Sequence, residues 1–149
     1  MINANDKKGK GERCSSDTRC LQASWLKNRQ SFFLLAEEAW EIVGTCNCSA
    51  FRKLRLAHRA EIGISVKKDY LGKGIGRQLL METIAKVRQA NIKLLSLEVG
   101  SDSSWAIHLY ESLGFRYIGT FKDFMAIDGQ AIDFIIMILE MEQKWLNQL

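Results

Sequence analysis

Residues 61–66 show the clearest alternation in the chain, with apolar side chains at the even positions and small or polar ones at the odd positions. This period of two predicts a strand with one buried face. Residues 75–90 instead place apolar side chains three and four apart, which predicts a helix with one buried stripe. A second strand over 92–99 completes a strand–loop–helix–strand unit, whose two strands we expect to run parallel. The helical stripe comprises Ile75, Leu79, Leu80, Ile84 and Val87.

Further elements are predicted on both sides of this unit. A short helix over 104–113 ends at Gly114, where a left-handed cap is expected because glycine adopts positive φ without strain. Two hairpins are expected, and the second closes at Asp128-Gly129. The predicted fold class is therefore α/β, a mixed sheet with parallel pairing at its centre. The hairpin strands cover 31–36 with 41–51, and 117–124 with 131–140.

The N-terminal part of this 149-residue chain differs in composition from the rest. We expect residues 1–19 to form a mobile basic arm and residues 20–149 to form a single domain. Residues 1–30 carry seven Lys or Arg against three Asp or Glu, whereas the later residues carry fourteen of each. A body without net charge argues against a nucleic-acid-binding groove. The residues spaced as one face of a short helix near the start are Leu21, Trp25 and Leu26.

No apolar stretch of the sequence has the length of a membrane span, and none resembles a signal peptide. We therefore expect a cytoplasmic protein that does not bind membranes. The four cysteines and two histidines lack the spacing of a zinc module, so no metal site is predicted. Cys46 and Cys48 point to the same face of a predicted strand, and we expect both to pack as thiols.

The most informative motif is a glycine-rich loop between the strand over 61–66 and the following helix. Gly72, Gly74 and Gly76 leave backbone N–H groups uncovered where the helix begins. The first amides of a helix have no partner within it and lie at the positive end of its dipole, so anions bind well there. Basic side chains crowd the same turn, opposed only by Asp69, and the loop is predicted to hold phosphate groups. These side chains belong to Lys67, Lys68, Lys73 and Arg77.

Three interpretations of the loop can be compared. A mononucleotide P-loop needs four residues between its glycines and then Lys with Ser or Thr, which Gly76-Arg77 excludes. A dinucleotide fingerprint starting at Gly72 would need its third glycine at position 77, although Glu98 lies where a ribose-binding acid would. The third interpretation is a glycine-rich turn whose only role is to connect a strand closely to the following helix. The loop by itself does not exclude this structural interpretation.

A longer set of motifs decides among these interpretations. EIGISV at 61–66, GKGIG at 72–76, LEV at 97–99 and AIHLYESLGF at 106–115 occur in this order. Together they resemble the GNAT superfamily of acetyl-CoA-dependent N-acetyltransferases. The resemblance implies the GNAT fold, with central splayed parallel strands. It also implies a shortened N-terminal region, because few residues precede the first predicted strand, where the family usually has an opening strand and two helices.

The resemblance further implies where acetyl-CoA would bind. The pantetheine amides would pair with the backbone of Ile64, Ser65 and Val66. Ser103 stands where the family commonly has Asn and could still hydrogen-bond the cofactor, whereas Leu71 replaces a usual Arg or Gln. The diphosphate would lie on the amides of Gly72, Lys73, Gly74, Ile75, Gly76 and Arg77.

Three side chains are candidates for the chemistry. Tyr110 matches the tyrosine that commonly acts in this family as the acid for the departing thiolate, and it would also contact the cofactor. Two carboxylates are candidates for the base. Glu98 matches the acid of ribosomal-protein N-terminal acetyltransferases, and Glu61 matches that of phosphinothricin-type enzymes. Each lies on the polar face of its strand, from which it could reach an amine through water.

The implied activity is acetyl transfer to a primary amine of a small molecule or a protein N-terminus, by direct attack in a ternary complex. The amine acceptor is the expected partner, and acetyl-CoA, without a metal, is the expected cosubstrate. The short N-terminal region leaves three alternatives for the acceptor side. It is open, completed by the second subunit of a homodimer, or without function. The alternative activity is that of a catalytically degenerate acetyl-CoA-binding module with a sensing or scaffolding role.

Overall fold

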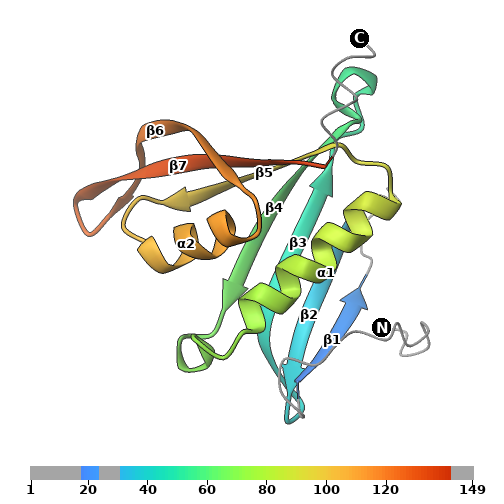
Figure 1. Ribbon diagram of the computed structural model, residues 1–149. Helices are drawn as coiled ribbons and strands as arrows, with labels where there is room; N and C mark the ends of the chain where they lie inside the picture. Colours follow the sequence, from blue (N-terminus) through green and yellow to red (C-terminus); the bar gives the residue numbers. More distant parts are fainter. Residues whose placement is uncertain (1–17, 24–30, 142–149) are drawn as a thin grey trace.

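A computed structural model of the protein describes residues 18–23 and 31–141 (Figure 1). These residues form one seven-stranded sheet, in the order β1-β2-β3-β4-β5-β7-β6, and two α-helices. The helices are α1 (Ile75–Gln89) and α2 (Ser104–Ser112), and two short 3₁₀ turns are η1 (Leu54–Leu56) and η2 (Lys68–Tyr70). The strands are β1 (Thr18–Ala23), β2 (Phe32–Glu38), β3 (Glu41–Ala50), β4 (Arg59–Val66), β5 (Leu94–Gly100), β6 (Arg116–Ile127) and β7 (Gln130–Glu140).

Strand β1 corrects two expectations. Leu21 lies in this strand and not in a short helix, whereas Trp25 and Leu26 lie outside the described residues. Thr18 and Arg19, which the sequence assigns to a mobile arm, also belong to β1, and the rest of that arm lies outside the described residues. All of β1 pairs antiparallel with β2. Residues 18–23 form a strand because they pair with β2, and their own sequence lacks the clear alternation that would predict a strand.

The other predicted elements are confirmed to within a few residues, together with their turns. Ala39 and Trp40 join β2 to β3, and both have positive φ, 50° and 66°. Asp128 and Gly129 join β6 to β7 with φ of 50° and 76°. Two consecutive residues at positive φ form the turn whose twist matches antiparallel strands. Gly114, at φ 96°, follows α2 in the predicted left-handed conformation.

The centre of the sheet is a parallel pair that separates early, as the predicted fold requires. β4 and β5 pair only at Arg59 with Leu94, Ala60 with Leu95 and Glu61 with Ser96. After these residues β4 stays paired with β3, and β5 stays paired with β7. Figure 1 shows the two strands diverging from their common end. The edge of β4 that faces β5 therefore lacks a strand partner over its C-terminal half.

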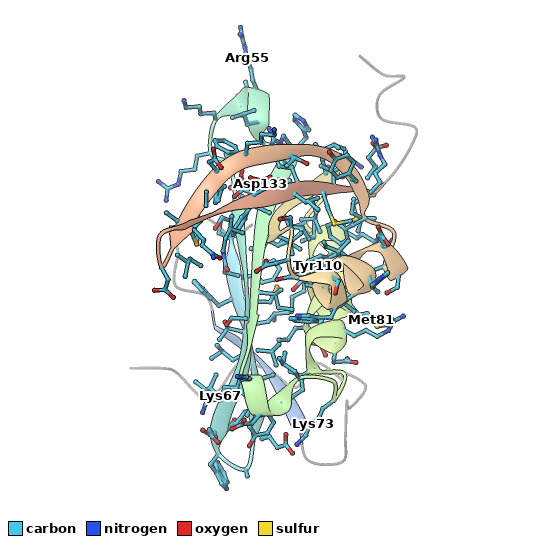
Figure 2. The ribbon with its side chains drawn as sticks, turned by 90° about the vertical axis from the view of Figure 1, so that its left-hand side faces the viewer. Arg55, Lys67, Lys73, Met81, Tyr110 and Asp133 are labelled. Carbon is cyan, nitrogen blue, oxygen red and sulfur yellow. The ribbon has the colours of Figure 1, made fainter. Side chains whose placement is uncertain are left out.

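Helix α1 covers β2, β3 and β4 and buries the whole predicted stripe, with Thr83 added to it. Thr83 donates its hydroxyl to the Sγ of Cys46, 3.2 Å away. A Cβ at Gly44 would lie 3.0 Å from Cδ1 of Leu79, so the helix lies close against β3 there. This packing fixes the N-terminus of α1 beside the end of β4. In Figure 2, α1 and α2 lie on the same side of the sheet.

Candidate active site

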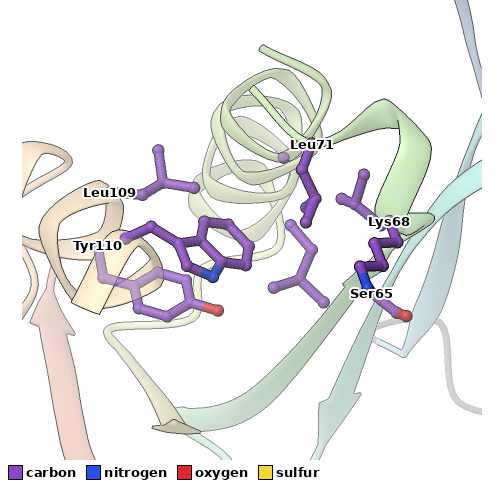
Figure 3. A pocket seen from close by; sticks show the side chains of 9 residues that line it. Ser65, Lys68, Leu71, Leu109 and Tyr110 are labelled. Carbon is purple, nitrogen blue, oxygen red and sulfur yellow. The ribbon is translucent and has the colours of Figure 1, made fainter. Parts of the chain in front are cut away.

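A pocket of about 260 Å³ lies where β4 has separated from β5. Its walls come from the end of β4, the loop that follows, the first turn of α1 and one side of α2. Figure 3 shows Ser65 and Tyr110 on opposite sides of it, with Leu71 and Leu109 near its upper rim. The lining residues are Ile64, Ser65, Val66, Lys68, Leu71, Gly76, Trp105, Leu109 and Tyr110.

The strand wall of the pocket is formed by residues that the sequence assigns to pantetheine binding. Ile64, Ser65 and Val66 pair with β3 on one side and have no pairing with β5 on the other. In an antiparallel pair, alternate backbone groups point away from the partner strand. Unpaired backbone groups need a partner from water or from a ligand. An amide-containing ligand lying along this edge could supply one.

The glycine loop leads into the first turn of α1, and it contributes to the pocket there. Gly72 and Gly74 have φ of 77° and 81°, a conformation that favours glycine. A Cβ at either residue would meet no other atom within 4 Å, so the loop surface is open. Gly76 lines the pocket, where a Cβ would lie 3.5 Å from Leu109. Ile75 itself is buried in the core and could offer only its backbone amide.

The four basic side chains predicted to crowd this loop have different surroundings. Lys67 forms an ion pair with Glu41. The Lys73 ammonium lies 4.6 Å from the centre of the Tyr70 ring. In Figure 2, Lys67 and Lys73 lie at the same end of the molecule. Arg77 donates to the hydroxyl of Ser112 at 3.1 Å. The one that lines the pocket is Lys68.

Tyr110 is the titratable side chain held most firmly at the pocket. It is 5% exposed, and its ring meets that of Phe115 edge to face, with centroids 5.8 Å apart. The backbone N–H groups of Leu113 and Phe115 both donate to the carbonyl of Tyr110 at 3.1 Å. Burial, with a smaller contribution from Cys46, raises the pKa of Tyr110 to about 12. The phenol therefore keeps its proton throughout the neutral range.

The two carboxylate candidates do not line the pocket. Glu61 and Glu98 are exposed and share the sheet face opposite α1, because Glu61 pairs with Ser96 and Glu98 is two positions farther along β5. Ser103 precedes α2, and its hydroxyl makes no capping hydrogen bond with the helix. The structure therefore brings Tyr110 and the β4 edge together and leaves both carboxylates on the other face.

The sequence placed Lys68 and Leu71 at the glycine loop without assigning them to a pocket, and it gave no role to the pocket residues Trp105 and Leu109. Trp105 and Leu109 are one helical turn apart on α2, and Trp105 is 54% exposed although it is large and apolar. Leu71 is also exposed, and Lys68 lies in η2. Residues four apart lie on the same side of a helix, so the sequence spacing of Trp105 and Leu109 could have identified this pair. No sequence pattern predicts where the side chains of the loop point.

Cys46 and Cys48, the cysteines whose side chains the structure describes, do not line the pocket. Cys46 and Cys48 are free and buried on the face that α1 covers, as predicted. Burial raises the pKa of Cys46 to about 11 and that of Cys48 to about 12, so both are neutral thiols near pH 7. Within residues 18–23 and 31–141, no group of three metal-ligating side chains comes together. In the same residues no helix has the length and apolar character of a membrane span.

A family model for the acetyltransferase (GNAT) family matches residues 4–115. The chain belongs to this family. The family match includes the end of β4, the glycine loop, α1, β5 and α2, which together build the pocket. The mixed sheet with splayed central strands is the fold of its GNAT neighbours.

Similar proteins include characterised and solved members of the GNAT family. The chain is 37% identical over 76 residues to the [ribosomal protein bS18]-alanine N-acetyltransferase of Escherichia coli, covering 51% of each chain. A GNAT acetyltransferase structure from Streptococcus pneumoniae is 28% identical, with a TM-score of 0.73 over 78% of this chain and 70% of that one. The yncA structure from Salmonella typhimurium, solved with its cofactor acetyl-CoA, shares the fold at 24% identity, with a TM-score of 0.70 over 76% and 66%. The chain spans 51–65% of the length of the first curated relatives that it matches.

The environment of Tyr110 predicts its titration. In a spectroscopic pH titration, the difference in phenolate absorbance between the wild type and Tyr110→Phe should have a midpoint near pH 12. Because the ordinary pKa of tyrosine is about 10, the folded state holds this proton more tightly than the unfolded chain. Stability should therefore fall as the pH rises from about 10 toward 12, and the substitution should remove the part of that fall due to Tyr110 while leaving the part due to the buried thiols of Cys46 and Cys48. A midpoint near 10 would show that the hydroxyl is not desolvated.

Proposed function

We propose that this protein transfers the acetyl group of acetyl-CoA to a primary amine, on a small molecule or a protein N-terminus. The observation that carries the proposal is the pocket itself. It joins the unpaired edge of β4, the first turn of α1 and a buried protonated tyrosine. A thioester carrier needs amide pairing, diphosphate binding and a donor near its sulfur, and each of these elements can supply one.

In this proposal acetyl-CoA lies with its pantetheine along Ile64, Ser65 and Val66. Its diphosphate rests on the backbone amides from Gly72 to Arg77, at the positive end of the α1 dipole. Lys68 adds a positive charge from the pocket wall. The hydroxyl of Ser103, which α2 does not use, is a further donor. The Salmonella structure supports this assignment because a neighbour of the same fold binds acetyl-CoA.

The proposed reaction is direct attack of the neutral amine on the thioester carbonyl. The nitrogen forms the amide bond, the carbon–sulfur bond breaks, and CoA leaves as the thiol. The proton that the amine loses passes through water to Glu98 or Glu61. Tyr110 transfers its hydroxyl proton to the leaving sulfur, a role that requires the proton to be present at neutral pH. The carboxyl then releases its proton to water and Tyr110 takes one up from water, so the site returns to its starting state. The E. coli relative, named for ribosomal protein bS18, supports an amine as the acceptor.

The diphosphate assignment is tested by a matched pair of glycine variants. Gly74 and Gly129 have nearly the same positive φ, 81° and 76°, and an added Cβ meets nothing at either site. Gly74→Ala and Gly129→Ala should therefore lose similar stability, about 1–2 kcal/mol. Only Gly74→Ala should weaken acetyl-CoA binding in calorimetry, by roughly tenfold or more, because it alone lies in the loop. Equal affinity in both variants would refute the assignment.

The chemistry is tested by Tyr110→Phe with Tyr117→Phe as the control. Tyr117 is 57% exposed on β6, where its hydroxyl lies 2.9 Å from that of Thr120. In a CoA-release assay over a panel of amines, Tyr110→Phe should lower kcat by about 10²-fold or more and leave acetyl-CoA affinity unchanged. Tyr117→Phe should behave as the wild type. Tight acetyl-CoA binding with no turnover on any amine would establish the binding module instead of the enzyme.

A further inference from the structure

The face of the sheet opposite α1 carries a compact group of polar side chains at the point where β4 and β5 separate. Glu61 and Ser96 form the last pair between these strands, and Glu98 follows Ser96 on the same face. Asn47 of β3 pairs with Gly63, the residue after the separation that shares this face. We call Asn47, Glu61, Ser96 and Glu98 the polar patch. It lies beside the opening between β4 and β5, which we call the fork, on the face of the sheet opposite the pocket.

Ser96 is the unusual member of the patch. It is only 8% exposed, and its Oγ has no hydrogen-bond partner among the described residues. A buried hydroxyl without a partner costs free energy, so its presence here calls for a ligand that would pair with it. Because serine is short and the flanking glutamates are exposed, Ser96 forms the floor between two longer carboxylate side chains.

The other members of the patch are also not paired with one another. Within residues 31–141, the side-chain carboxylates of Glu61 and Glu98 make no hydrogen bond or ion pair. Arg59 shares this face of β4, but its guanidinium stacks on Phe51, 5.3 Å from the ring centre. A Cβ at Gly63 would lie 2.7 Å from Oδ1 of Asn47, so glycine leaves room for that amide against β4. Neither carboxylate therefore has a partner among the described residues that would compete with a ligand, and the Ser96 hydroxyl is buried beside them.

What these four groups share is the capacity to accept hydrogen bonds. The carboxylates only accept, and the Ser96 hydroxyl and the Asn47 amide oxygen can accept as well. An ammonium group carries one positive charge and three donors without an acceptor, which matches this set. We propose that the polar patch binds the acceptor in its ammonium form, and that the protein selects polycationic amines over amino acids that carry a carboxylate of their own.

This inference rests on the proposed function and narrows its substrate class. A second positive charge on the acceptor adds attraction to the two glutamates, whereas a carboxylate next to the amine is repelled by them. Lowering the ionic strength should strengthen the preference, because the glutamates are exposed and salt screens them. Spermidine is a suitable polycationic probe, and L-alanine is the matching amine that carries a carboxylate.

The test is calorimetric titration of spermidine and of L-alanine into the protein loaded with CoA, which binds without turnover. Spermidine should bind at least about tenfold more tightly than L-alanine. Glu61→Gln and Glu98→Gln should each weaken spermidine binding by roughly tenfold. Asp128→Asn, which removes a carboxylate from the β6–β7 turn and keeps a residue that tolerates its positive φ, should have no effect.

The variant Ser96→Ala distinguishes an effect on spermidine binding from an effect on stability. The substitution removes an unpaired buried hydroxyl, so the melting temperature should stay the same or rise. Spermidine affinity should nevertheless fall about threefold. Unchanged affinity in Ser96→Ala and both glutamine variants, or L-alanine binding as tightly as spermidine, would overturn the proposal. If the wild type does not bind CoA, the proposed function fails, and spermidine titrated into the unloaded protein still tests the patch.

Discussion

The early separation of two parallel strands is the constraint on which the rest of this structure depends. Hydrogen bonding between β4 and β5 ends at Glu61 and Ser96, and the C-terminal half of β4 keeps a partner on one edge only. Backbone groups cannot stay unpaired without cost, so an open strand edge inside a protein needs water or a ligand. The pocket on one face and the polar patch on the other both border this opening. In our proposals, acetyl-CoA binds on one side of this opening and the amine acceptor binds on the opposite face of the sheet.

Two packing arrangements hold the fork open. The close contact of α1 with β3 at Gly44 and Leu79 keeps the helix N-terminus beside the end of β4. On the other side, the turn after α2 places two N–H groups on the carbonyl of Tyr110 and packs Phe115 on its ring. Neither arrangement uses a charged group. The site is therefore shaped by apolar packing and backbone hydrogen bonds.

The strongly periodic part of the fold could be predicted from the sequence. The alternation at 61–66 and the helical stripe from Ile75 to Val87 both reflect burial against one layer, so pattern and structure agree. Strand β1 could not be predicted, because it depends on pairing with β2 and not on its own pattern. Of the site, backbone positions such as Ile64 and Gly76 could be placed, since motif order fixes them along the chain. Side-chain directions could not, which is why Lys67 and Lys73 were grouped with Lys68 although their partners lie elsewhere.

The central claim is that the open edge of β4 and the first turn of α1 bind CoA together. Amide chemical-shift changes during a titration with CoA test it most directly, because they report on backbone groups one residue at a time. The largest changes should fall on residues 64–66 and 72–77, with little change in the hairpin of β6 and β7. Changes that spare both segments while CoA binds elsewhere would contradict the account.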